Sequence, residues 1–189
     1  ILMIGFGSVA RCTLPLLLKH VNIPLDYITI IDGKDKRDEL ASWTRRGVHF
    51  RQVQITPGNL SQVLSDQVSS GDLILDLSLN IDGADIITWC NRHDVLYINA
   101  SVEVWDPYAG EENGFPYEKT LHSRHMRLQE RTAGWSDAPT CIVDHGANPG
   151  LISHFAKRGL VDIADRMIRD GIAPDPDRFR SLIANRRYA

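Results

Sequence analysis

Short apolar runs alternate with longer stretches of mixed apolar and polar residues along most of the chain. Six runs have the length and pattern of strands: Ile1–Ile4, Tyr27–Ile31, Val48–Val53, Asp72–Leu77, Val95–Asn99 and Thr140–Asp144. Several are nearly continuous in apolar residues, which is typical of parallel strands covered on both faces. The pattern therefore predicts a buried parallel sheet.

The segments between these runs are long enough to form crossover helices. The expected helices are Ser8–His20, Lys36–Arg46, Asn59–Val68 and Asp82–Arg92. Parallel strands need such crossovers, and their hand is almost always right. The alternation predicts an α/β fold with a Rossmann-type, doubly wound parallel sheet. Pro15 removes one helical N–H, so we expect the first helix to bend there.

The pattern changes after the fifth predicted strand. The segment Asp106–Thr120 is rich in Gly, Pro and acidic residues and predicts a long loop. An amphipathic helix is expected over Tyr117–Thr132, and a further helix from Gly150 to about Asp170. The remaining tail shows no apolar pattern of its own, so it is expected to be a connection.

These patterns also predict the domain organisation. We expect residues 1–150 to form the Rossmann domain, and residues 151–189 to lead into a second domain that this sequence does not contain. The chain starts inside a predicted strand at Ile1, without an initiator methionine, so an upstream segment is expected as well.

Composition narrows the class of protein. The 189 residues are 43% hydrophobic and 24% charged, which is typical of a globular chain. With 21 basic and 24 acidic residues the net charge is -3, which predicts no attraction to nucleic acid or to an anionic membrane. No apolar run reaches the roughly 20 residues of a membrane span, and no signal peptide is visible. Cys12, Cys90 and Cys141 form no CxxC pair and are expected to be reduced and buried in a cytoplasmic protein.

The sequence GFGSVA at positions 5–10 follows the first apolar run and opens the first predicted helix. Gly5 allows a tight turn, Gly7 lets a pyrophosphate approach the backbone, and Ala10 lets the helix pack closely on the sheet. The helix start at Ser8 and Val9 offers unpaired N–H groups to the phosphates. The motif predicts dinucleotide binding.

Asp32 ends the second apolar run, 22 residues after the last residue of this motif. A carboxylate at this place accepts hydrogen bonds from the ribose hydroxyls and repels a 2′-phosphate, which favours NAD over NADP. Three cations close by partly offset that repulsion, namely Lys34, Lys36 and Arg37. The alternative is that Asp32 caps a helix or forms a turn.

The later strand ends carry small, polar or acidic residues, in the segments DLSLN, INASVEVWD and DHGANPGL. Ligands of open α/β sheets bind beyond the carboxyl ends of the strands. We therefore expect Ser78, Asn99 and Ala100 to line the nicotinamide half of the cofactor site. Each of them is alternatively a turn former.

Three stretches, GFGSVA, NASVEVWDPY and HGANPGLISHF, together resemble the homospermidine synthases, a family related to the saccharopine dehydrogenases. The resemblance runs from Ile1 to about Asp170. The first stretch is shared by many dinucleotide enzymes, whereas the other two are specific.

The resemblance implies an NAD-dependent transferase that joins two putrescines into homospermidine and releases ammonia. NAD takes a hydride from one diamine and returns it to the coupled imine, so no net oxidation occurs. The resemblance also implies a cytoplasmic homodimer with a second, catalytic domain. Most substrate-binding acids and a key tryptophan of the family would then lie beyond Ala189.

The visible residues are also suited to a diamine, because a dication binds to carboxylates and aromatic faces. Glu103 and Asp106 flank Trp105 after the fifth predicted strand. By resemblance, Glu103 binds an ammonium group and assists proton transfer. Asn148 matches a family position near nicotinamide and substrate, and Ala147 beside it is assigned to the cofactor.

Each of these substrate residues also has a purely structural interpretation. Glu103 is alternatively a solvated strand-end acid, Trp105 a packing residue and Asp106 a turn former. His145 and His154 flank the Asn148 turn, and structural roles are expected for them.

A metal site is not expected. His122 and His125, with Glu118, have spacing that suits zinc, but Arg124 and Arg127 oppose a cation there.

Two rival functions remain. A saccharopine-type dehydrogenase acting on an amino-acid adduct needs Lys or Arg for the substrate carboxylates, and residues 99–112 contain neither. A non-catalytic NAD-binding module is the other rival.

Overall fold

The computed structural model describes residues 1–107 and 116–184. The chain divides into two compact units, Ile1–Asp144 and His145–Ala189, which are described separately below. The predicted loop Asp106–Thr120 lies largely outside the described residues, and its end, Pro116–Lys119, forms the short helix η2.

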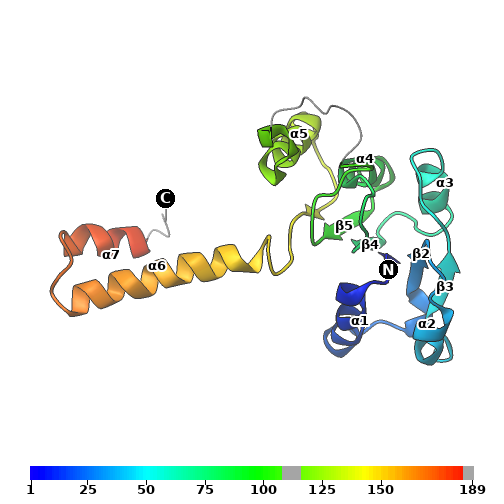
Figure 1. Cartoon of the computed structure of the whole chain (residues 1–189), viewed down its shortest axis with the longest axis horizontal. Coiled ribbons are helices and arrows are strands. Elements are labelled where there is room, and N and C mark those ends of the chain that lie inside the picture. The colour runs from blue at the N-terminus through cyan, green and yellow to red at the C-terminus, as the bar shows by residue number, and fades with distance from the viewer. Residues whose placement is uncertain (108–115, 185–189) are drawn as a thin grey trace. The chain divides into compact units, whose positions relative to one another are not determined.

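The first unit is built on a parallel sheet (Figure 1). The described residues form six strands: β1 (Leu2–Ile4), β2 (Thr29–Asp32), β3 (His49–Gln52), β4 (Leu73–Asp76), β5 (Leu96–Asn99) and β6 (Cys141–Ile142). The order is β3-β2-β1-β4-β5-β6, and every neighbouring pair is parallel. The predicted doubly wound sheet is thus confirmed. The strand order reverses between β1 and β4, which is where such sheets bind ligands.

Helices connect the strands in the predicted places. They are α1 (Ser8–His20), η1 (Leu25–Tyr27), α2 (Arg37–Thr44), α3 (Leu60–Ser65) and α4 (Gly83–His93). The α1 helix continues across Pro15, so the missing N–H of this residue does not end the helix.

Side chains that alternate along β1 pack on opposite faces of the sheet. Met3 joins a core with Ala10 and Leu14 of α1, whereas Leu2 and Ile4 join a core that includes residues of α3 and α4. All three β1 side chains are almost completely buried. Helices on both faces explain why the strand runs read as continuously apolar.

A helix of two parts follows β5. The predicted helix Tyr117–Thr132 begins within η2 and continues as α5 (Leu121–Thr132). The Thr120 hydroxyl accepts a hydrogen bond from the Ser123 N–H and so caps α5. Leu128 packs α5 against the core that contains α4.

The second unit contains α6 (Leu151–Arg169) and α7 (Pro176–Ala184). The sequence pattern predicts no helix where α7 lies, and the expectation that the tail connects to a further domain stays a prediction. Asp175 accepts a hydrogen bond from the Arg178 N–H at 3.0 Å, and Pro176 takes the first helical position, where its missing N–H costs nothing. In the part of the chain that the structure describes, no helix combines the length and apolar character needed to cross a membrane.

The three cysteines are free, but only one is buried. Cys90 is buried in α4, and burial raises its pKa to about 12, so it is a poor nucleophile. Cys12 is exposed on α1, which corrects the expectation that all three are buried. The reason is that Cys12 falls between Ala10 and Leu14, the residues that α1 turns toward the sheet.

Candidate functional site

A cleft of about 460 Å³ lies at the carboxyl ends of β1, β2 and β4, where the strand order reverses. Its wall contains residues from the glycine-rich turn and from the ends of β2 and β4: Gly5, Gly7, Asp32, Lys34 and Ser78. Four of these are expected from the sequence to contact a dinucleotide.

The two glycines of the turn have different surroundings. Gly5 has a φ of +86°, and a Cβ there would lie 2.9 Å from the backbone oxygen of Leu77. Only glycine therefore fits where the turn passes the end of β4. At Gly7 a Cβ would meet nothing within 4 Å, so its Cα faces open space that a phosphate can occupy.

The N-terminus of α1 borders this open space. Gly7 is the N-cap, no side chain caps the helix, and its first turn contains no acidic residue. The first N–H groups, around Ser8 and Val9, are thus available to an anion. Ala10 is completely buried, so α1 packs closely on the sheet, as the motif predicts.

Asp32 joins the glycine-rich turn to the end of β2. Its Oδ2 accepts a hydrogen bond from the Phe6 N–H at 2.7 Å, and its Oδ1 accepts one from the Lys34 N–H at 2.8 Å. Each carboxylate oxygen retains a lone pair for a ribose hydroxyl. Asp32 does not cap α2, whose N-cap is Lys36.

A chain of buried polar groups runs along the ends of β4, β5 and β6. The Asp76 carboxylate accepts hydrogen bonds from the Ser78 hydroxyl at 2.6 Å and from the Tyr97 hydroxyl at 2.8 Å. Asn99 donates to Tyr97 at 3.0 Å and accepts from the Asp144 N–H at 2.8 Å. Both ends of the Asn99 amide are therefore engaged inside the protein, and its contact with nicotinamide remains a prediction.

Burial shifts the pKa values of two members of this network, Asp76 and Tyr97. Burial raises the pKa of Asp76, although hydrogen bonds from Ser78 and Tyr97 oppose the shift. Burial, together with the charge of Asp76, raises the pKa of the Tyr97 hydroxyl well above its usual value. Tyr97 therefore keeps its proton and acts as the donor to Asp76.

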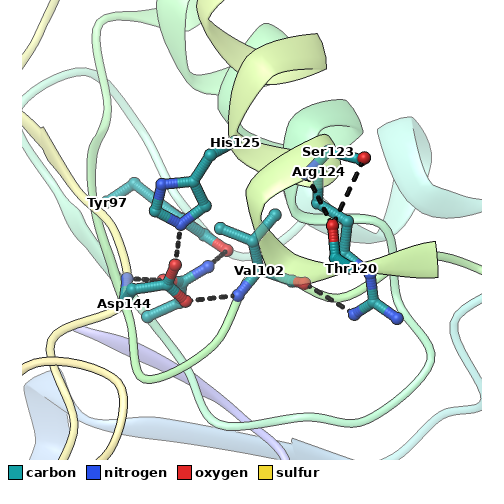
Figure 2. Close-up of polar contacts among 8 residues, drawn as sticks. Tyr97, Val102, Thr120, Ser123, Arg124, His125 and Asp144 are labelled. Atoms are coloured by element: carbon teal, nitrogen blue, oxygen red, sulfur yellow. Dashed lines mark hydrogen bonds and ion pairs between the residues drawn. The ribbon is translucent and has the colours of Figure 1, made fainter. Parts of the chain in front are cut away.

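The backbone that carries Glu103 is held by neighbouring elements (Figure 2). The Val102 N–H donates to Asp144 Oδ1 at 2.8 Å, and Arg124 Nη1 donates to the Val102 carbonyl at 2.9 Å. The same Nη1 lies 3.8 Å from Glu103 Oε2. His125 Nε2 contacts the second carboxylate oxygen of Asp144.

From the sequence, Arg124 is expected only to oppose a metal ion through its positive charge. The segment 99–112 contains no basic residue, but the fold brings Arg124 of α5 beside Glu103. No local pattern reveals a contact that depends on how α5 packs. The acids Asp76 and Asp144, to which the sequence assigns no role either, have a clearer signal, because each lies at or next to the end of a predicted strand.

The other predicted substrate residues differ in their surroundings. Trp105 is half-buried against the core, and its indole N–H donates to Asp85 Oδ2 at 2.7 Å, as a packing residue would. Asp106 is exposed, and Ala100 is half-buried directly after β5.

Ala147 and Asn148 belong to the second unit, so their roles remain predictions. The Gly146 N–H donates to the Pro149 carbonyl at 3.0 Å, which closes the turn that contains both residues. The Asn148–Pro149 peptide bond is cis.

The histidines of α5 do not converge on a metal. His125 is paired with Asp144, and His122 is exposed. The side chain of Glu118, the third residue of that spacing, lies outside the described part of the structure. Among the described residues no group of three His, Cys, Asp or Glu side chains is arranged to hold a metal ion.

Comparisons with known proteins identify the family of this chain. Residues 1–143 match the family model of the saccharopine dehydrogenase NADP-binding domain. The homospermidine synthase of Mesorhizobium japonicum is 29% identical over 167 residues, covering 87% of this chain and 34% of the relative. That of Blastochloris viridis is 33% identical over 172 residues, covering 87% and 35%.

A solved structure is similar as well. The crystal structure of the homospermidine synthase from Legionella pneumophila, in complex with NAD, superposes with a TM-score of 0.71 at 31% identity. The match covers 93% of this chain and 34% of that one. The chain therefore spans about a third of the length of the relatives it matches.

Proposed function

The chain belongs to the saccharopine dehydrogenase NADP-binding domain family, and from this premise we propose that it is the NAD-binding part of a homospermidine synthase. The protein would join two putrescines into homospermidine and release ammonia, acting as a cytoplasmic homodimer. The observation that carries the proposal is the cleft at the strand reversal, where Gly7 faces open space beside an uncapped helix N-terminus.

The cofactor in this proposal is NAD. Asp32 is held in the cleft by two backbone N–H groups, with its remaining lone pairs available to the ribose. Its charge disfavours a 2′-phosphate. Lys36, which also lines the cleft, is engaged by Glu39 at 2.8 Å and so offers less attraction to an added phosphate. The NAD found in the Legionella relative supports this choice.

NAD supplies the hydride acceptor for one diamine and the hydride donor for the coupled imine, so atoms and electrons balance without another oxidant. Glu103 is the proposed acceptor for a substrate ammonium. Its side chain is largely shielded from solvent, which strengthens an ion pair relative to an exposed one. Asn148 is the proposed hydrogen-bond partner of the amine or imine nitrogen.

One observation favours a second candidate, a saccharopine-type NAD(P) oxidoreductase that acts on an amino-acid adduct. Such a substrate carries carboxylates, and Arg124 supplies a guanidinium 3.8 Å from Glu103. Arg124 is already engaged by the Val102 carbonyl and Glu103, so it has fewer donors left for a substrate.

The test is to incubate the intact protein with putrescine and NAD⁺ and to identify products by mass spectrometry. We expect homospermidine and ammonia in equal amounts, with NAD required only in catalytic quantity. Absence of homospermidine would reject the proposal. A parallel incubation of NAD⁺ with a secondary-amine adduct of two amino acids, in which NADH accumulates in step with adduct oxidation, would favour the second candidate.

A further inference from the structure

We propose that Arg124 and Asp144 are positioning residues that fix the segment after β5 and so determine where the Glu103 carboxylate stands toward the substrate. The inference rests on the proposed function of Glu103. Neither residue is assigned to substrate or cofactor contact.

Hydrogen bonds from three elements hold the backbone of Val102 and Glu103. Asp144 after β6 binds the Val102 N–H, Arg124 of α5 binds the Val102 carbonyl, and the Gly83 N–H of α4 donates to the Glu103 carbonyl at 3.1 Å. Val102 is 2% exposed. The segment that carries Glu103 is thus tied by hydrogen bonds to α4, to α5 and to the residue that follows β6, although it lies beyond the sheet.

Asp144 is the centre of this arrangement (Figure 2). Its N–H donates to Asn99, while its two carboxylate oxygens engage Val102 and His125. Its φ of +54° lies in the left-handed region, which Asp and Asn tolerate better than most residues. One buried residue thus joins the ends of β5 and β6 to α5.

Arg124 combines a backbone contact with a charge contact. The same Nη1 donates to the Val102 carbonyl and lies 3.8 Å from Glu103 Oε2, and both side chains are mostly shielded from water. Burial raises the pKa of Asp76, and the charge of Glu103 makes a smaller contribution in the same direction. Arg124 therefore offsets negative charge in this region.

The chain offers a matched control for Arg124. Arg127 lies one turn further along α5 and is exposed. Arg124→Met and Arg127→Met remove the same charge from the same helix, but only the first removes the contacts to Val102 and Glu103.

The first measurement needs no substrate. Hydrogen exchange is followed on the peptide covering residues 99–105 in the full-length protein with NAD bound. We expect exchange about tenfold faster in Arg124→Met and in Asp144→Ala. Asp144→Asn, which keeps one acceptor oxygen and the left-handed backbone, should stay close to wild type, as should Arg127→Met. Unchanged exchange in Arg124→Met would overturn the proposal, and it can be read even if Asp144→Ala does not fold.

The second measurement is a double-mutant cycle with Glu103→Gln, using putrescine coupling as the readout. We expect Arg124→Met to lower kcat/KM about 10- to 100-fold with NAD affinity unchanged, because a misplaced pocket group has effects of that size. In the Glu103→Gln background the same change should cost less than about threefold. Equal losses in both backgrounds would show that Arg124 does not act through Glu103. If wild-type protein forms no homospermidine, the proposed function fails, whereas the exchange measurement still decides whether Arg124 and Asp144 fix the segment after β5.

Discussion

At the scale of single residues, the glycines of one turn show how the backbone creates space for a ligand. Gly5 is needed by the protein itself, because its positive φ and the nearby Leu77 backbone leave no room for a side chain. Gly7 is not needed by the fold, because its φ of -88° suits any residue and a Cβ there would meet only open space. That space is therefore available for a ligand.

This difference predicts opposite outcomes for two small substitutions. Gly5→Ala should lower the free energy of unfolding by about 2 kcal/mol, since it adds a strained φ and a backbone contact. Gly7→Ala should leave stability within about 0.5 kcal/mol of wild type, but weaken NAD binding about tenfold. Chemical denaturation and calorimetric titration measure the two effects. Loss of stability in Gly7→Ala with normal NAD affinity would show that Gly7 has no role at the ligand.

The residue types in the sequence predict the chemistry of the site well, but they predict the contacts between its side chains poorly. Asp32 ends the second strand, and its place in the cleft follows from the parallel pairing of that strand with β1, which the strand–helix–strand pattern predicts. Arg124 reaches Glu103 only because α5 packs on the core through Leu128, 25 residues after Glu103 in the sequence. Contacts of this kind depend on tertiary packing, which a local pattern does not encode.

At the scale of elements, helix α1 contributes to the site through how closely it packs. Ala10 is completely buried in the core with Met3, Leu14 and Ile30. A small side chain there brings the start of α1 to the ends of β1 and β4. The apolar periodicity predicts this helix with its observed bounds, Ser8–His20.

Enlarging Ala10 should therefore affect both stability and binding. Ala10→Leu is expected to cost about 1–3 kcal/mol through overpacking and to weaken NAD binding as the helix start moves away from the cleft. Cys12→Leu adds bulk on the exposed side of the same helix and should change neither. Thermal unfolding with and without NAD measures both effects, and equal behaviour of the two variants would contradict the close-packing argument.

Other elements show where sequence patterns fail. Most of the strands are predictable because they are apolar runs bounded by polar residues, whereas β3, with the sequence HFRQ, is mostly polar and exposed. Helix α7 escapes prediction because its start signal is a capping Asp175 followed by Pro176, and not an apolar run. Capping chemistry and apolar periodicity are independent signals, and α7 can be predicted only from its capping residues.

At the scale of the whole molecule, the chain combines a six-stranded parallel sheet with a separate helical unit. The sheet unit contains the cleft and the segment that carries Glu103, whereas the second unit begins with the turn that carries Asn148. Since the chain spans about a third of its relatives, we expect the proposed enzyme to use further substrate ligands outside these 189 residues.

The most direct test of the account is to titrate NAD and NADP into the intact protein by calorimetry, beside Asp32→Asn. The account predicts that wild-type protein binds NAD at least about tenfold more tightly than NADP, and that Asp32→Asn reduces this preference because the repelling carboxylate is gone. Binding of neither nucleotide by folded wild-type protein would contradict the assignment of the cleft, and an unchanged preference in Asp32→Asn would contradict the role given to Asp32.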